Sequence, residues 1–182
     1  MHESVIMSGF GGQGILLMGQ LLCYAGMQEG LNVTWMPSYG PEMRGGTANC
    51  TVMLSSNRVG SPVTRNPFSL VAMNKASLDR FEATIQANGF LLLNTSLIDR
   101  DPSRKDLTVI RVPANQIAEK AGTVQVTNMA ALGAYVGAKK TVSLESALQA
   151  LRKMIPAHRK ELLSVNEAAL RQGAEVARTQ IS

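Results

Sequence analysis

The chain has 182 residues, of which 45% are hydrophobic and 17% are charged, and its formal net charge is +5. This composition is typical of a globular domain with a sizeable core, and it excludes a disordered or low-complexity chain. The lysines and arginines are scattered without a dense basic run or interleaved aromatic residues, so nucleic-acid binding is not expected.

The chain starts with a short apolar run, Ser4–Ser8, followed by a glycine turn and a long apolar segment, Ile15–Met27. The turn matches G-x-G-x-x-G at Gly9, Gly11 and Gly14. Strand, glycine turn and helix in this order predict an anion or nucleotide site, because free N–H groups and the helix dipole attract negative charge. In the alternative interpretation, the glycines only let the helix pack tightly on the sheet. The candidate cofactor-binding residues of this turn are Gly9, Gly11, Gly12, Gln13 and Gly14.

The second strand is predicted over Asn32–Met36, with Pro37 closing it. A typical NAD site needs an acidic residue about 20 residues beyond the glycine turn, at the end of this strand. Pro37 and Ser38 stand there instead. The sequence therefore disfavours NAD as the ligand.

The next strand is predicted over Thr47–Ser55, where apolar and polar residues alternate. The preceding loop is too short for a parallel crossover, so this strand should run antiparallel. Val59–Pro62 is a candidate to pair with it.

Apolar strands and helical patterns then alternate, which predicts a Rossmann-like, doubly wound and mostly parallel sheet. The antiparallel excursion covers about residues 47–62, the C-terminal part is helical, and residues 1–182 form a single α/β domain. Ser77 is expected to cap the helix predicted over Leu78–Ala87. The strands are predicted over Leu70–Met73, Phe90–Leu93 and Leu107–Val112, and the helices over Leu78–Ala87, Ala114–Lys120, Asn128–Lys139, Leu144–Met154 and Arg159–Arg178.

Ligands of doubly wound sheets bind beyond the carboxyl ends of the strands. The glycine turn should share that edge with the residues that follow the other strands, Ser38, Asn74, Asn94–Thr95 and Pro113. We therefore add Ser38 and Asn74 to the candidate cofactor-binding residues.

The loop Ser38–Gly46 has an unusual composition for a plain connector. Tyr39 and Met43 would supply apolar contact to a partner, while Arg44 would supply a planar donor for a carboxylate or phosphate. In the alternative, Glu42 and Arg44 form a surface ion pair that only stiffens the loop. We favour a preorganised recognition loop.

The cysteines and histidines predict no catalytic or metal centre. Cys23 and Cys50 are too few for an iron–sulfur or zinc site and are expected to be core thiols in a reducing compartment. His2 and His158 lack partners at a readable spacing. Without a signal-like or membrane-spanning run, we expect a cytoplasmic protein with no membrane contact.

Several motifs together resemble the gamma subunit of 2-oxoacid:ferredoxin oxidoreductases over about residues 4–140. The loop beginning Tyr39-Gly-Pro-Glu-Met-Arg-Gly-Gly46 is similar to that of the 2-oxoglutarate and branched-chain 2-oxoacid enzymes, whereas pyruvate-type loops more often read Glu-Arg-Arg-Gly. The motifs are Gly9-Phe-Gly-Gly-Gln-Gly14, Pro37–Val52, Gly60-Ser-Pro62, Ala72-Met-Asn74, and Asn128-Met129 with Leu132-Gly133.

The resemblance implies a complex that decarboxylates a 2-oxoacid, above all 2-oxoglutarate, and forms an acyl-CoA. Thiamine diphosphate, magnesium and iron–sulfur clusters would belong to alpha and beta partner chains, with a delta chain as a further candidate, and these chains would pass electrons to ferredoxin. This chain would bind none of them alone and would be inactive in isolation. Coenzyme A contact by the glycine turn or Arg44 is a further implication. The expected subunit-interface residues are Tyr39, Glu42, Met43, Arg44, Asn128 and Met129.

Two apolar helices agree with a subunit role. Ile15–Met27 and Asn128–Val136 have almost no polar face, and Gly133 with Gly137 would let another backbone approach closely. Burial under helices of the same domain is the open alternative. The rival functions are a free-standing nucleotide-binding oxidoreductase, a scaffold without a ligand, and a 2-oxoisovalerate- or pyruvate-specific version of the same complex.

Overall fold

The computed structural model describes residues 1–39, 46–155 and 161–181. Its centre is a six-stranded sheet with the strand order β2-β3-β1-β4-β5-β6. The strands are β1 (His2–Phe10), β2 (Asn32–Tyr39), β3 (Thr47–Ser55), β4 (Ser69–Ala72), β5 (Phe90–Asn94) and β6 (Thr108–Val112).

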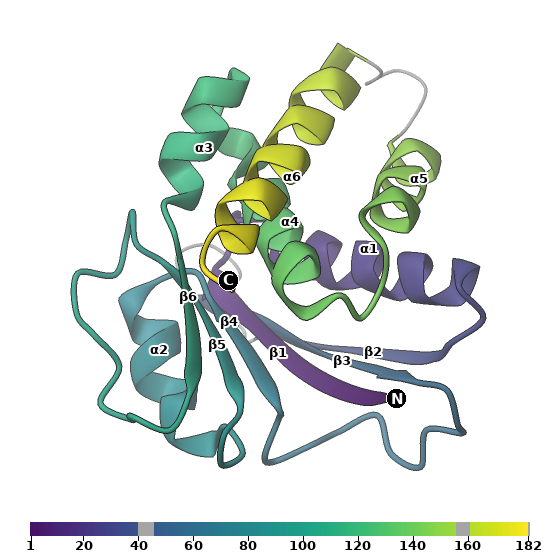
Figure 1. Ribbon diagram of the computed structural model, residues 1–182, viewed down its shortest axis with the longest axis vertical. Coiled ribbons are helices and arrows are strands. Elements are labelled where there is room, and N and C mark those ends of the chain that lie inside the picture. The colour runs from purple at the N-terminus through teal and green to yellow at the C-terminus, as the bar shows by residue number, and fades with distance from the viewer. Residues whose placement is uncertain (40–45, 156–160, 182) are drawn as a thin grey trace.

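Helices cover the two faces of this sheet unequally (Figure 1). One face carries the large core under five helices, and the other carries a small core under α2 and the short turn η1. No helix in the described part of the chain is long and apolar enough to cross a membrane. The helices are α1 (Ile15–Gln28), α2 (Lys75–Phe81), η1 (Glu82–Thr84), α3 (Ala114–Ala121), η2 (Val124–Val126), α4 (Thr127–Lys139), α5 (Leu144–Met154) and α6 (Leu163–Arg178).

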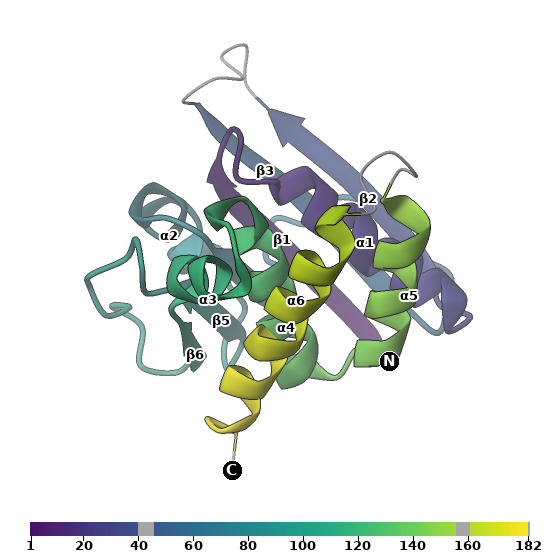
Figure 2. The same ribbon diagram turned by 90° about the horizontal axis from the view of Figure 1, so that it is seen from above.

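The strand directions agree with the sequence prediction. β1 pairs in parallel with β4, β4 with β5, and β5 with β6, whereas β3 lies antiparallel between β1 and β2. Figure 2 shows β2 and β3 extending beyond the helices on one side of the molecule. The predicted α/β fold with one antiparallel excursion is confirmed, because the short connection before Thr47 cannot make a parallel crossover.

Three local predictions were wrong. β2 runs through Pro37, which is opposite Cys50 in the register; proline is tolerated because β2 is an edge strand. Val59–Pro62 forms no strand. The helix after β4 starts earlier than predicted, because Asn74 caps it by accepting a hydrogen bond from the Ser77 backbone N–H at 2.8 Å.

Helix α4 is buried inside this chain. Residues 127–137 are buried, and glycines bring α4 and α6 into backbone contact: a Cβ on Gly137 would lie 2.7 Å from the carbonyl oxygen of Ala174. The predicted close approach at Gly133 and Gly137 therefore occurs, but the approaching backbone is α6 of the same chain. The same-domain alternative is the correct interpretation for α4.

A buried ion pair joins α4 to the first strand, at the edge opposite the glycine turn. Lys139 Nζ lies 3.0 Å from Glu3 Oε2, and their side chains are 15% and 5% exposed. The Ser69 hydroxyl donates to Glu3 Oε1 at 2.6 Å, and the Lys139 ammonium lies 4.2 Å from the ring centroid of Phe68. Both charges thus have compensating partners, as buried charges require.

The outer edge of the sheet at β6 is closed by a side chain. Gln180 Oε1 accepts from the Arg111 N–H at 3.0 Å, and Gln180 Nε2 donates to the Arg111 carbonyl at 2.7 Å. The amide thereby takes the place of a neighbouring strand at this residue and blocks edge-to-edge association there.

Candidate functional site

The carboxyl ends of β1, β4, β5 and β6 meet at one edge of the sheet, as predicted. The Met73 N–H donates to the Ser8 carbonyl at 2.9 Å, which joins the ends of β1 and β4. Asn94 then donates to the Met73 carbonyl at 3.2 Å and accepts from the Ala114 N–H at 3.1 Å. The helices after β1 and β4 lie on opposite faces, so the boundary between these two strands, next to the glycine turn, is a topological switch point, where ligands of this fold class bind.

Positive φ angles and a close side-chain contact require glycine in the turn. Gly12 and Gly14 have φ angles of 95° and 70°, and Gly14 is the N-cap of α1 without a side-chain cap. A Cβ on Gly14 would also lie 2.9 Å from Cγ of Asn128, whose Nδ2 donates to the Gly14 carbonyl at 3.2 Å. Tight packing therefore accounts for part of the motif, and ligand binding remains a proposal.

Internal hydrogen bonds occupy several N–H groups of the turn. The Phe10 N–H donates to Gln13 Oε1 at 2.6 Å, and the Gln13 N–H returns to the Phe10 carbonyl at 3.1 Å. The Gly11 N–H donates to the Gly46 carbonyl at 2.9 Å. The first helical hydrogen bond runs from Met18 to Gly14, so the N–H groups of residues 15–17 are the donors that α1 directs outward.

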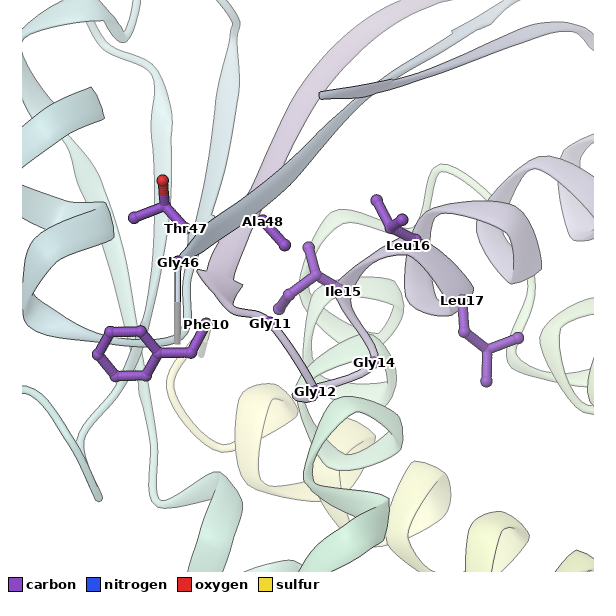
Figure 3. Close-up of a pocket in the computed structure, with 10 residues that line it drawn as sticks. All are labelled: Phe10, Gly11, Gly12, Gly14, Ile15, Leu16, Leu17, Gly46, Thr47 and Ala48. Carbon is purple, nitrogen blue, oxygen red and sulfur yellow. The ribbon is translucent and has the colours of Figure 1, made fainter. Parts of the chain in front are cut away.

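A cavity of about 300 Å³ lies between the turn and the start of β3 (Figure 3). Phe10 and Leu17 point away from the turn on opposite sides, while Ile15 and Ala48 form the wall between them. Apolar side chains and glycine backbone make up most of the surface. The lining residues are Phe10, Gly11, Gly12, Gly14, Ile15, Leu16, Leu17, Gly46, Thr47 and Ala48.

The other predicted cofactor-binding residues lie outside this cavity. Gly9 is buried at the end of β1, and Gln13 closes the turn with its own side chain. Ser38 is exposed on β2, opposite Asn49. Asn74 is 2% exposed, and in the described part of the chain its Nδ2 has no hydrogen-bond partner.

The predicted recognition loop is only partly described. The backbone of Tyr39 belongs to β2, where it is opposite Ala48. Glu42, Met43 and Arg44 lie outside the described residues.

The two interface residues predicted on α4 are turned inward. Met129 is 0% exposed and Asn128 is 4% exposed, and Asn128 holds the Gly14 carbonyl. Core packing within the chain leaves the Met129 side chain no surface for a partner, and the subunit interface as a whole stays a prediction.

Arg80 is not among the site residues predicted from the sequence. Its Nη1 donates to Thr47 Oγ1 at 3.3 Å, and its guanidinium lies 5.0 Å from the ring centroid of Phe81. Thr47 lines the glycine-turn cavity and pairs with Phe10, so Arg80 brings a cation from α2 to the edge of the site. No motif marks this arginine, because α2 and β3 meet only in the folded chain.

Titratable groups elsewhere are structural. Burial raises the pKa of Cys23 and of Cys50 to about 12, so both are unreactive core thiols, as predicted. Burial also acts to raise the pKa of Glu82, but hydrogen bonds from the Arg104 N–H and the Ser103 hydroxyl outweigh it and lower that pKa. Within the described ranges, no group of three or more His, Cys, Asp or Glu could hold a metal ion.

Residues 4–176 match the model of the family described as pyruvate ferredoxin/flavodoxin oxidoreductase. The chain belongs to this family. Within it, the crystal structure of the gamma subunit of a keto/oxoacid ferredoxin oxidoreductase from Geobacter sulfurreducens superimposes with a TM-score of 0.86 at 28% identity, covering 98% of both chains. The resemblance to gamma subunits that the motifs indicated is thereby confirmed.

Two curated relatives in the family differ in length. Ketoisovalerate oxidoreductase subunit VorA from Methanothermobacter marburgensis is 37% identical over 97% of this chain, but the chain spans only 37% of VorA. 2-Oxoglutarate synthase subunit KorC from Methanocaldococcus jannaschii is 32% identical over 98% of this chain and 95% of KorC.

The same fold occurs inside a larger chain of solved structure. 2-Oxoglutarate:ferredoxin oxidoreductase from Magnetococcus marinus, solved with 2-oxoglutarate, coenzyme A and succinyl-CoA bound, has a TM-score of 0.87 to this chain. The match covers 98% of this chain and 31% of that one at 22% identity, a level that supports the fold alone.

Proposed function

We propose that this chain works as the gamma subunit of a multisubunit 2-oxoacid:ferredoxin oxidoreductase. The complex would decarboxylate a 2-oxoacid oxidatively and form an acyl-CoA. The observation that carries the proposal is the match, over 98% of both chains, to the gamma subunit from Geobacter sulfurreducens.

The substrate we propose first is a branched-chain 2-oxoacid, because VorA is 37% identical to this chain. The sequence motifs alone favoured 2-oxoglutarate, and KorC, at 32% identity, supports this second candidate. Since no part of the described chain carries an evident 2-oxoacid site, we expect the partner chains to select the substrate.

The contribution we propose for this chain to the reaction is contact with coenzyme A at the glycine turn. The outward N–H groups of residues 15–17 would donate to carbonyl or phosphate oxygens, and Arg44 or Arg80 would supply positive charge. A volume of about 300 Å³ is at the lower end for ligand pockets, so the cavity would hold one portion of coenzyme A.

Partner chains would carry the rest of the machinery. We propose alpha and beta subunits, with a delta subunit as a further candidate, holding thiamine diphosphate, magnesium and iron–sulfur clusters and reducing ferredoxin. We also propose a cytoplasmic location, which suits two buried free thiols.

Coexpression with the neighbouring open reading frames tests the proposal. We expect a copurifying complex that forms acyl-CoA from 2-oxoisovalerate or 2-oxoglutarate, and the assay over several 2-oxoacids identifies the substrate. Turnover of a nucleotide or 2-oxoacid by the isolated chain would instead support a free-standing enzyme.

Two arginine variants test the coenzyme A contact. Arg44→Ala and Arg80→Gln complexes should show a raised KM for coenzyme A, while KM for the 2-oxoacid stays unchanged. Arg65→Gln removes an exposed arginine that does not line the cavity and serves as the matched control. An unchanged KM for coenzyme A in both test variants would exclude these contacts.

A further inference from the structure

The outer face of α1 is apolar although it is exposed. Leu17, Tyr24 and Met27 are 41%, 46% and 56% exposed, and their spacing of seven and three residues places them on one side of the helix. We call these three residues the α1 stripe. The opposite side of α1 packs on β3, where Gly19 meets Cys50.

No charged residue occurs anywhere in the 14 residues of α1. The other surface helices of this face differ: α5 carries Glu145, Arg152 and Lys153 within 11 residues, and α6 carries charges along its length. A surface helix without charges is unusual for a face that meets water, whereas depletion of charge with enrichment of aromatic residues and methionine is typical of interface cores.

A groove adjoins the stripe. It has a volume of about 270 Å³ and lies between α1, η2 and the facing ends of α5 and α6. Val124, which is 50% exposed, lies in η2 between two lining residues, Thr123 and Gln125. Leu17 belongs to both the stripe and the groove. The apolar residues that line the groove are Leu17, Leu21, Val126, Leu151, Met154, Ile155 and Leu162.

The α1 stripe and the groove lie next to each other and share Leu17. Four of the ten large apolar residues that the described structure exposes, three on α1 and one on η2, lie around this one surface. Contiguous apolar surface of this kind marks a binding site for another protein surface, and a pocket beside it suits one aliphatic or aromatic anchor.

Two relatives indicate which polypeptide would cover the α1 stripe and the groove. In VorA the domain equivalent to this chain makes up 37% of the protein, so it is joined there to a much longer stretch of polypeptide. The Magnetococcus chain repeats this arrangement, with 31% of its length matched. A domain that is elsewhere part of a larger chain must present a surface to the rest of that chain, and such a surface is apolar in obligate assemblies.

We propose that the α1 stripe and the adjoining groove form the docking surface for the polypeptide that corresponds to the remainder of VorA. The contacting face of this partner is apolar and uncharged, and one aliphatic or aromatic side chain fills the groove. This inference rests on the proposed function, since it assumes an oxidoreductase complex.

Charge placed on the stripe tests the proposal. In the coexpressed complex, Tyr24→Lys and Met27→Lys should each weaken retention of the VorA-like partner by about tenfold or more, and the double variant should abolish it. Leu17 stays unchanged because it also lines the glycine-turn cavity. Val63→Lys, at a residue that is 56% exposed in the loop after β3, and Leu97→Lys, at 41%, are matched controls expected to assemble normally.

The possible results distinguish failure of the proposed docking surface from failure of the proposed function. Unfolding midpoints and circular dichroism of the isolated variants should equal those of the wild type, because the substituted side chains already meet water. Normal assembly of the double variant in an active complex would overturn the proposed docking role of the α1 stripe and leave the proposed function intact. A wild-type chain that joins no such complex would remove the function itself. Self-association of the isolated chain, abolished by the double variant, would identify a second copy as the occupant and overturn the proposal.

Discussion

Replacing Gly133 with alanine should push α4 and α6 apart and destabilise the fold. The added Cβ would lie 2.7 Å from the carbonyl carbon of Leu170 and 2.9 Å from its Cα, and closer still to its oxygen. Real Cβ atoms essentially never approach other heavy atoms below 3.0 Å. Because every one of these atoms belongs to the α6 backbone, no side-chain rotation relieves the clash.

Two effects of opposite sign decide the magnitude. Alanine is favoured over glycine inside a helix by about 1 kcal/mol. Overpacking a core costs about 1–3 kcal/mol, and separating the helices by about 0.5–1 Å forfeits a quarter to a half of each remaining dispersion contact. Since residues 127–137 are buried, the packing loss extends along most of α4. We expect the free energy of unfolding to fall by about 2 kcal/mol.

Urea unfolding followed by circular dichroism measures the change. Gly60→Ala is the control, since an added Cβ there meets nothing within 4 Å and the backbone is not in the positive-φ region. This control should stay within about 0.5 kcal/mol of the wild type. A Gly133→Ala protein as stable as the wild type would refute the packing argument, because helix propensity would then outweigh the contact with Leu170.

Three further predictions concern other contacts. Asn74→Ala should lower the free energy of unfolding by about 1 kcal/mol through loss of the α2 cap, whereas Asn74→Asp keeps the acceptor and most of the stability; equal losses would contradict a capping role. Lys139→Met should cost about 3 kcal/mol because it leaves Glu3 buried and unpaired, and adding Glu3→Gln should recover much of this loss in thermal unfolding. The folded pKa of Glu82 is lowered, so its stabilisation is present above the unfolded pKa and is lost as pH falls through the folded pKa. In urea unfolding at several acidic pH values, the free energy of unfolding should therefore fall less steeply with decreasing pH for Glu82→Gln than for the wild type. Equal pH dependence of the two proteins would show that Glu82 does not contribute.

Local patterns in the sequence determined most of the secondary structure. Alternation marked Thr47–Ser55 as a strand, and helical periodicity placed Leu144–Met154 as the structure has it. The antiparallel direction of β3 followed from loop length alone. The glycine turn was recognisable because positive φ angles at Gly12 and Gly14 restrict the residue type.

The sequence was less informative about residues whose role depends on their contacts in the folded chain. Pro37 looked like a strand end, because only the sheet order shows that β2 is an edge where a proline is tolerated. Ser77 was the predicted cap of α2, and only the hydrogen bond from the Ser77 N–H to Asn74 Oδ1 shows that Asn74 caps this helix instead.

Two apolar helices looked alike in the sequence, and only the tertiary structure separated them. The sequence by itself determined that both α1 and α4 must hide apolar faces from water. The fold decided that α6 covers α4, through backbone contact at Gly133 and Gly137, while the Leu17–Met27 side of α1 stays exposed. Burial depends on which segments meet in space, and composition does not contain that information.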